Sequence, residues 1–457
     1  TALVHKPNDA TVALREGIFE YARKRLEYDP APLDAPQTFE YLTENAGPTV
    51  TEEGLGGLKS LKLFENVLAP ATISTDHPGY LSFIPCAPTE AAKLFDLVVS
   101  ASAIYGGSWM EGAGAVYAEN EVLTWLAKEA GLPAGAGGVF VQGGTLGNLS
   151  ALVAARHRAA ARLKAAGQPK PDSWKFICSA EAHSSLKAAA AVMDVEIIKA
   201  EVDGEGRLRG SAVQAAMDAA GDGVFAIVAT GGTTNFGIVD KLDEIGAIAN
   251  ANSIWFHVDG AYGLAGILSP ASKPLFAGLE KADSFIVDPH KWLFAPFDAC
   301  ALLYRNPEDG RQAHTQHGEY LDTLTESGDW NPSDYAYNLT RRPRGLPLWF
   351  SLATHGIRAY REAVTHNVEL AREIADEIKR RSDFELVREP ELSVVVFTKD
   401  GWTLNDYNAW SEKLLQDGIA FVVPSSHQGK PNTRFAIVNP ETSFELLCQI
   451  LDSMESK

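Results

Sequence analysis

One stretch decides the fold of this chain: Ser284-Phe285-Ile286-Val287-Asp288-Pro289-His290-Lys291-Trp292. Its apolar run, Phe285 to Val287, ends at the turn signal Asp-Pro, which is typical of a buried strand. Lys291 follows in the loop beyond the carboxyl end of that strand, where open α/β sheets bind their ligands. A lysine between a histidine and a tryptophan suits an amine whose proton affinity is lowered so that it can attack a carbonyl.

Short apolar runs alternate with helical stretches on the amino-terminal side of this segment. Strands are predicted at 139–141, 176–178, 196–198, 225–228, 254–258 and 285–287. Such alternation favours a mostly parallel sheet with helices on both faces. Beyond a helix predicted at 358–381, strands at 393–398, 420–423 and 433–438 mix with helices in an α+β pattern. Three parts are therefore predicted: a helical segment 1–75, a large domain 76–343 and a small α+β domain 344–457.

Composition limits the classes of partner and the location. The 457-residue chain has a formal net charge of −19, which argues against nucleic acid and against an anionic membrane surface. The four cysteines lie far apart without a C-x-x-C pair, which suits a reducing cytoplasm. No apolar run is long enough to span a membrane, and the charged first residues show no secretory signal.

Three further polar segments follow strands of the predicted sheet. The first, Gln142-Gly143-Gly144-Thr145-Leu146-Gly147-Asn148, opens a helix, and free N–H groups at a glycine-rich helix start attract phosphate. It lacks both the G-K-[ST] of a P-loop and the G-x-G-x-x-G spacing, so a nucleotide is disfavoured. The other two segments carry His183, in 179–185, and Asp259, in 256–262.

Each feature also has an ordinary structural interpretation, as a helix start, an exposed histidine or a helix-capping aspartate. Together, however, they supply a phosphate cradle, an imidazole that can stack on a ring, a carboxylate that can hold a heteroaromatic nitrogen protonated and an amine that can trap an aldehyde. Pyridoxal 5′-phosphate needs all four, and its ring is an electron sink for a broken Cα bond. The sequence therefore predicts this cofactor, bound by Lys291, Asp259 and His183.

The same motifs resemble the group II pyridoxal-phosphate amino-acid decarboxylases, which include aromatic L-amino-acid, glutamate and tyrosine decarboxylases. The matching stretches are 143–149, 181–185, 229–234, 257–262, 288–292, 341–346 and 434–437. The resemblance implies fold-type I (aspartate-aminotransferase-like), an α/β fold with a mostly parallel central sheet. It also implies a homodimer, formed with the N-terminal helical segment, whose active sites lie at the subunit interface.

Carried over residue by residue, the resemblance implies roles for the individual side chains. Lys291 would hold the cofactor aldehyde, Asp259 would pair with the pyridinium nitrogen, and His183 would stack on the ring. Four further residues would bind the phosphate end or orient the ring: Gly144, Thr145, Thr234 and His290. Ala261 would pack beneath the ring.

In the family a mobile loop supplies a tyrosine that protonates the carbanion after carbon dioxide leaves. The corresponding stretch here is 327–337, in which Tyr335 follows an aspartate. Trp330 and Tyr337 lie in the same stretch, and Tyr337 is the alternative donor. The resemblance thus implies Tyr335 as the catalytic acid.

The substrate pocket is predicted from aromatic residues before the alternating region. Tyr80 and Phe83 lie in a loop with two prolines, and Trp109 follows a glycine-rich stretch; the rings either pack on the core or line a pocket. No arginine stands near them to bind a distal carboxylate. The expected reaction is therefore α-decarboxylation of an L-amino acid with an aromatic or apolar side chain, giving the amine and carbon dioxide.

Other functions are left open. With the same cofactor, oxygen can react with the carbanion and give an aldehyde, ammonia and peroxide, or the substrate can be non-aromatic. A scaffold that binds the cofactor without catalysis is a further class. A metal hydrolase is disfavoured, because His314 and His317 lack an acidic partner and are expected to be exposed loop residues.

Overall fold

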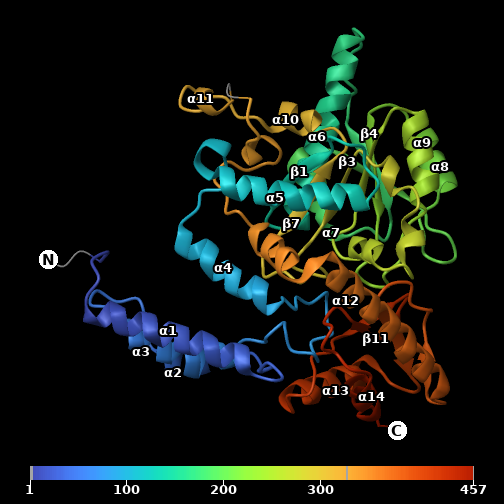
Figure 1. The fold of residues 1–457 in the computed structure, drawn as a ribbon. Coiled ribbons are helices and arrows are strands. Elements are labelled where there is room, and N and C mark those ends of the chain that lie inside the picture. The colour runs from blue at the N-terminus through green and yellow to red at the C-terminus, as the bar shows by residue number, and fades with distance from the viewer. Residues whose placement is uncertain (1–3, 326–327, 456–457) are drawn as a thin grey trace.

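The computed structural model describes residues 4–325 and 328–455, and a seven-stranded sheet forms its centre (Figure 1). Its strands are β1 (Gly137–Val141), β2 (Lys175–Ser179), β3 (Glu196–Ala200), β4 (Val224–Thr230), β5 (Trp255–Asp259), β6 (Ser284–Val287) and β7 (Cys300–Tyr304). Their spatial order is β1-β7-β6-β5-β4-β2-β3. Only β7 runs antiparallel to its neighbours, β1 and β6. The predicted mostly parallel sheet is confirmed.

Both faces of the sheet are buried, and successive side chains enter two different cores. In β6, Phe285 and Val287 pack into one core with Val258, whereas Ile286 packs into the other. This alternation explains the continuous apolar runs, because neither side of a central strand meets water.

Helices cover each face. The first core takes side chains from α5 (Trp109–Glu129), α8 (Gly210–Ala220), α9 (Leu242–Ala251) and α12 (Leu346–Arg380). The second takes them from α6 (Gly144–Ala165) and α7 (Ser184–Met193), and α10 (Pro307–His314) packs on α6. Short helices complete this part: η3 (Gly263–Leu268), η4 (Lys273–Phe276), η5 (Leu279–Lys281), α11 (Asp322–Thr325) and η6 (Pro332–Asp334).

The long helix α12 leads from the central sheet into a second, antiparallel sheet (Figure 1). Its strands are β8 (Phe384–Leu386), β9 (Val394–Lys399), β10 (Pro424–His427) and β11 (Lys430–Ala436), in the order β10-β11-β9-β8. The flanking helices are α13 (Leu404–Gln416) and α14 (Phe444–Asp452), whose apolar faces form a third core with α12. The predicted α+β unit is confirmed.

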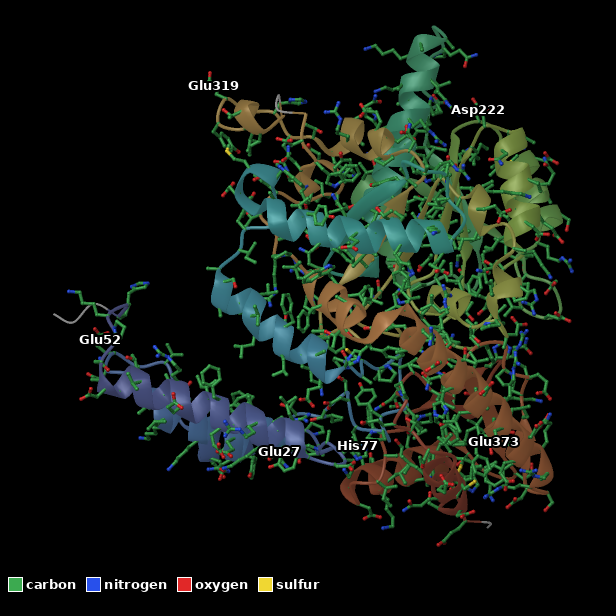
Figure 2. The ribbon with its side chains drawn as sticks, viewed as in Figure 1. Glu27, Glu52, His77, Asp222, Glu319 and Glu373 are labelled. Carbon is green, nitrogen blue, oxygen red and sulfur yellow. The ribbon has the colours of Figure 1, made fainter. Side chains whose placement is uncertain are left out.

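The N-terminal helices stand apart from this body as an arm (Figure 1). They are α1 (Asp9–Glu27), α2 (Phe39–Ala46) and α3 (Gly57–Leu63), continued by η1 (Phe64–Leu68) and η2 (Ala69–Ala71). None of the residues in α1, α2 or α3 is buried. Figure 2 shows side chains along the arm, near the labelled Glu27 and Glu52, pointing into open space. Helix α4 (Glu90–Ser102) then leads into the body.

Several elements differ from their predicted positions. The proline- and glycine-rich region 30–60, whose composition favours irregular chain, contains α2, and neither β7 nor β8 was predicted. The strand expected at 420–423 lies later, as β10, while Phe421 forms an isolated bridge with Tyr80. Within residues 4–325 and 328–455, no helix is long and apolar enough to cross a membrane.

Candidate active site

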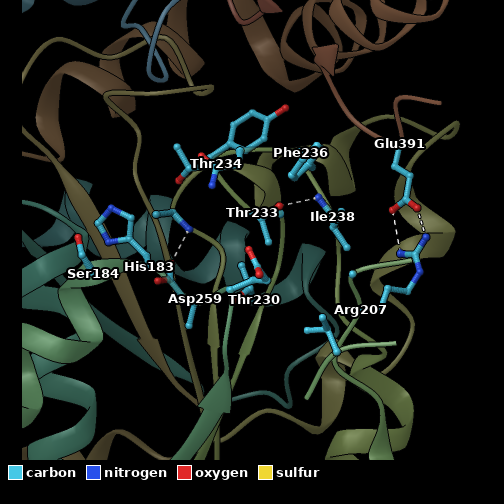
Figure 3. A pocket seen from close by; sticks show the side chains of 18 of the residues that line it. His183, Ser184, Arg207, Thr230, Thr233, Thr234, Phe236, Ile238, Asp259 and Glu391 are labelled. Carbon is cyan, nitrogen blue, oxygen red and sulfur yellow. Dashed lines mark hydrogen bonds and ion pairs between the residues drawn. The ribbon is translucent and has the colours of Figure 1, made fainter. Parts of the chain in front are cut away.

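A cavity of about 1150 Å³ opens beyond the carboxyl ends of the parallel strands. Figure 3 shows His183 and Asp259 on one side of it and the Arg207–Glu391 ion pair on the other. The lining includes all eight residues that the sequence predicted to bind the cofactor: Gly144, Thr145, His183, Thr234, Asp259, Ala261, His290 and Lys291. They come together because the carboxyl ends of parallel strands share one edge of the sheet.

Lys291 lies in the turn after β6, three residues beyond Asp288. Its Nζ is 3.1 Å from Asp288 Oδ2, and the Asp288 side chain is only 3% exposed. Burial favours the neutral amine, but the negative charges of Asp288 and Asp259 outweigh it and raise the pKa of Lys291 above its ordinary value. The predicted lowering of its proton affinity is therefore wrong, because Asp288, three residues earlier in the chain, forms an ion pair with the amine.

Asp259 is the last residue of β5, and both of its carboxylate oxygens are engaged. Oδ2 accepts a hydrogen bond from Asn148 Nδ2 at 2.9 Å, and Oδ1 accepts one from the Ala261 N–H at 3.2 Å. Both partners are donors, so both carboxylate oxygens act as acceptors. The side chain is therefore held in a fixed orientation at the cavity.

His183 and the start of α6 lie on the same side of the cavity. His183 precedes α7, and its Nδ1 accepts a hydrogen bond from the Ser185 N–H at 3.1 Å, which fixes one edge of the ring. Helix α6 starts after Gly143 without a side-chain cap, so its first N–H groups are left for an anion. At Gly147 a Cβ would lie 2.9 Å from Ile286 Cγ2 and from Cys300 Sγ, so α6 packs directly on β6 and β7.

The residues beside Lys291 are fixed from behind. His290 Nδ1 accepts a hydrogen bond from the Ala299 N–H at 2.9 Å. Burial lowers the pKa of His290, against the opposing charge of Asp288. Trp292 is fully buried, stacks on Tyr262 and donates from Nε1 to Asn367 Oδ1 at 3.0 Å. The loop that carries Lys291 is thus anchored on both sides.

Four other predicted residues are not among the described residues that line this cavity: Tyr80, Phe83, Trp109 and Tyr335. Tyr335 is 4% exposed, stacks on Trp330 and packs in the second core. Burial raises the pKa of its phenol above the ordinary value. Tyr337 is 70% exposed. Ser327, at the start of the predicted loop, lies outside the described residues.

Phe83 and Trp109 occupy other parts of the surface. Phe83 is 61% exposed with φ of +53°, and its carbonyl accepts a hydrogen bond from Arg434. Trp109 opens α5, where its N–H donates to Asn331 Oδ1 at 3.0 Å. These positions leave their role as a substrate pocket a prediction.

Three polar residues of the sequence motifs had no predicted role: Asn148, Asp288 and Arg434. Asn148 donates to Asp259, and Asp288 pairs with Lys291. Arg434 is 9% exposed, and its Nη1 is buried without a hydrogen-bond partner among the described residues. Burial lowers its pKa to about 10, so it remains a cation at neutral pH. Arg434 is thus a buried cation that forms no ion pair with a carboxylate among the described residues, which suggests a binding group for an anion. Only the structure could reveal this feature.

At the far end of the cavity, two arginines are held by one glutamate. Arg207 Nη1 donates to Glu391 Oε2 at 2.9 Å, and Arg388 Nη2 donates to Oε1 at 3.0 Å. Both guanidinium groups are therefore engaged within the protein.

The donor set fits pyridoxal phosphate better than a metal ion. An amine, a carboxylate held by donors, an imidazole and an uncapped helix start line one cavity. In the part of the chain that the structure describes, no group of three or more histidine, cysteine, aspartate or glutamate residues could hold a metal. His314, expected to be exposed, is instead buried and bonds the Ser150 carbonyl at 2.8 Å.

Comparison with known proteins gives a consistent result. Residues 42–399 match the model of the pyridoxal-dependent decarboxylase conserved domain. The chain is 31% identical to the aromatic-L-amino-acid decarboxylase of Bacillus atrophaeus over 82% of this chain and 80% of that protein. It is 29% identical to the L-2,4-diaminobutyrate decarboxylase of Acinetobacter baumannii over 76% and 72% of the two chains. The crystal structure of Oryza sativa TDC with PLP and tryptamine has the same fold, with a TM-score of 0.91, 22% identity and 99% of both chains covered.

Proposed function

Because this chain belongs to the pyridoxal-dependent decarboxylase family and pyridoxal phosphate is its cofactor, we propose that it decarboxylates an L-amino acid with an aromatic or apolar side chain. The products are the corresponding amine and carbon dioxide. The observation that carries the proposal is the gathering of Lys291, Asp259 and His183 in one cavity whose arginines are already engaged.

The cofactor, when bound, supplies the electron sink for the bond broken at the substrate Cα. Lys291 would hold its aldehyde, and the first N–H groups of α6 would bind its phosphate. Asp259, whose carboxylate accepts from two donors, would hold a proton on the ring nitrogen. His183 would lie against the ring, with Nδ1 fixed by the Ser185 N–H. These side chains bind and orient the group.

The substrate class is supported by the charges of the cavity. Arg207 and Arg388 both bind Glu391, so neither is free to bind a distal carboxylate, which disfavours glutamate and aspartate as substrates. The relative from Bacillus atrophaeus is named for aromatic amino acids, which supports the same class. The relative from Acinetobacter baumannii is named for diaminobutyrate, so a basic amino acid is the second candidate.

Arg434 supplies a binding group for an anion. Its unpartnered Nη1 is buried, and its charge acts on Tyr262, which lines the cavity. We assign Arg434 to the α-carboxylate of the substrate, which every amino acid carries. Its Nη2 bond to the Phe83 carbonyl couples this contact to the loop that contains Tyr80.

The enzyme is proposed to be a homodimer whose arm, residues 1–75, packs on a second copy. Phe19 and Phe39 are 45% and 80% exposed on that arm, and α1 has no buried residue. In the proposed dimer, Tyr80, Phe83 and Trp109 line the substrate pocket at the subunit interface, and Tyr335 belongs to the loop that acts there.

The chain is proposed to divide into three parts, at residues 75 and 343. The free thiols of Cys86, Cys178 and Cys300 support a cytoplasmic location.

The alternative product is an aldehyde, formed with ammonia and peroxide when molecular oxygen, and not an acid, reacts with the carbanion. Tyr335 is buried and is not among the described residues that line the Lys291 cavity of its own chain, so in this chain it does not reach the carbanion as an acid. This observation supports the aldehyde as the second candidate product. This alternative changes the fate of the carbanion and leaves the site unchanged.

One substrate panel tests these proposals. Purified protein with added pyridoxal phosphate is incubated with each common amino acid, and carbon dioxide, amine, aldehyde and peroxide are measured. We expect carbon dioxide and amine from phenylalanine, tyrosine, tryptophan or their hydroxylated forms, and at least a thousandfold loss in the Lys291→Ala variant. Activity on glutamate or aspartate alone contradicts the proposed substrate class, and carbon dioxide release that survives in Lys291→Ala contradicts the site.

A further inference from the structure

A connected set of buried polar residues leads from Asp259 and Asn148, which line the cavity, to three residues that are not among the described lining residues: His257, Ser284 and Trp255. Asn148 Nδ2 donates to Asp259 Oδ2, and Asn148 Oδ1 is 2.8 Å from His257 Nε2. His257 Nδ1 is 2.7 Å from Ser284 Oγ, which also accepts from Trp255 Nε1 at 2.8 Å. Every member is at most 6% exposed, so water cannot substitute for these bonds.

The two ends of this chain of bonds fix its direction. An indole N–H can only donate, and an ionised carboxylate can only accept. The amide atom that faces Asp259 must therefore be the Asn148 nitrogen, which leaves the amide oxygen facing His257. That oxygen needs a donor, so His257 carries its proton on Nε2. Its bare Nδ1 then accepts from the Ser284 hydroxyl, whose oxygen is left free for Trp255.

The imidazole has no other consistent state. Burial lowers the pKa of His257 to about 3, so the ring is neutral at any working pH. With the proton on Nδ1 instead, Nε2 and the Asn148 oxygen would be two facing acceptors. An inverted amide would restore that bond but would set its oxygen against the Asp259 carboxylate.

Asn148 also reaches the second cofactor residue. Its Nδ2 donates to Ser185 Oγ at 3.1 Å, and the Ser185 backbone N–H is the group that fixes His183 Nδ1. One amide thus supports both the carboxylate beneath the ring nitrogen and the segment that carries the stacking imidazole.

We propose that Asn148 and His257 are positioning residues: a one-way chain of hydrogen bonds, from Trp255 through Ser284, His257 and Asn148, holds Asp259 in place as an anion for the cofactor ring nitrogen. The proposal rests on the proposed role of Asp259. It adds a positioning role for Asn148, which lines the cavity, and for His257, which is not among the described residues that line it.

The first test measures the tautomer of His257 in the wild-type protein, and a variant is needed only to assign its NMR signal. Nitrogen-15 NMR of the histidine-labelled holoenzyme, with the His257→Gln variant used to assign the signal, reports the tautomer directly. We expect the Nε2–H form, unchanged from pH 5.5 to 9. An Nδ1–H tautomer of His257, or a His257 signal that titrates in this range, overturns the proposal. This result does not depend on the substrate, so it stands apart from any failure to release carbon dioxide.

The second test compares matched variants by the dissociation constant of pyridoxal phosphate, followed through its visible absorbance. We expect Asn148→Leu and His257→Leu to weaken binding about tenfold. Asn148→Leu removes the amide that donates to Asp259, and His257→Leu removes the N–H that holds this amide in place. His257→Gln keeps an N–H toward Asn148 and is expected to bind within threefold of the wild type. Ser150→Ala removes another buried hydroxyl of α6 and serves as the control. Equal affinity in all four variants, or equal loss in His257→Gln and His257→Leu, overturns the proposal.

Discussion

At the scale of single residues, two opposing effects determine the pKa of the Lys291 amine. Burial favours the neutral form of Lys291, but the carboxylates of Asp288 and Asp259 favour the ammonium and prevail. Only the neutral amine attacks an aldehyde, so the ion pair with Asp288 protects the site from reaction until a proton is removed. Asp288 therefore controls how fast the cofactor is captured.

The Asp288→Asn variant tests this control. Removing the charge 3.1 Å from Nζ lowers the pKa of Lys291, so a larger fraction of the amine is neutral at pH 7.5. Capture of pyridoxal phosphate by the apoenzyme should accelerate about tenfold for each unit by which that pKa falls. Stopped-flow absorbance between pH 6.5 and 9.5 measures it. Asp222→Asn, on an exposed turn labelled in Figure 2, is the control; identical pH profiles for all three proteins would contradict the assignment.

His257 predicts a pH dependence of stability. Its pKa is about 3 in the folded protein, below the ordinary value of 6.5, so the unfolded chain binds the additional proton between these limits. Stability from this group is complete above pH 6.5 and decreases by about 1.4 kcal/mol per unit as the pH falls toward 3. Urea unfolding of the apoprotein at pH 4.5, 5.5 and 7 measures the slope. The His257→Gln variant should lose that part of the slope, and an unchanged slope would contradict it.

At the scale of elements, local pattern predicted those strands and helices that repeat the α/β alternation. The runs at 225–228 and 285–287 lie within β4 and β6, because strands buried on both faces are continuously apolar. Strand β7 was not predicted, since it follows β6 without an intervening helix and pairs antiparallel. Helix α2 was not predicted in a segment whose prolines and glycines favour irregular chain.

The contact between α6 and β6 is a prediction at this scale. A Cβ at position 147 would approach Ile286 and Cys300 to 2.9 Å, so Gly147→Ala must push the start of α6 away from the sheet. We expect a loss of about 1–3 kcal/mol in unfolding free energy, together with weaker binding of pyridoxal phosphate. Denaturant unfolding and cofactor titration measure the two effects.

Gly114→Ala provides the matched control for that experiment. Gly114 lies within α5, and a Cβ there meets no atom within 4 Å. Alanine should therefore stabilise the helix by about 0.5–1 kcal/mol and leave cofactor binding unchanged. If both glycine variants behave alike, close packing at position 147 is not what places the helix start.

At the scale of the whole molecule, the sequence predicted that the proposed cofactor residues gather at one cavity, but not where the proposed substrate residues lie. The eight cofactor residues follow strand ends, and the shared edge of a parallel sheet brings such residues together. The contacts of Asn148 with His257 and of Arg434 with the Phe83 carbonyl join segments 109 and 351 positions apart, which no local pattern encodes. In the proposed homodimer, whether Tyr80 and Trp109 line a substrate pocket depends on how the second copy packs, which no local pattern predicts.

The proposed homodimer accounts for the exposed surface of the arm. Helices that bury no side chain gain little from packing on their own chain, and exposed rings such as Phe39 cost free energy in water. A second chain that covers α1 and α2 removes both penalties. The proposed homodimer therefore predicts that a charge on this surface separates the subunits.

Phe19→Glu and Phe39→Glu test that prediction by sedimentation velocity over a concentration series. Each places an unpaired carboxylate in the proposed interface, so the dimer dissociation constant should rise about 30-fold or more, and decarboxylase activity should fall at concentrations where the dimer is lost. Val192→Glu, at a 74% exposed position on α7, introduces the same change outside the arm and should leave both quantities unaltered. A wild type that stays monomeric and active at micromolar concentration would contradict the dimer. Glu variants that associate as the wild type does would instead place the interface away from the arm.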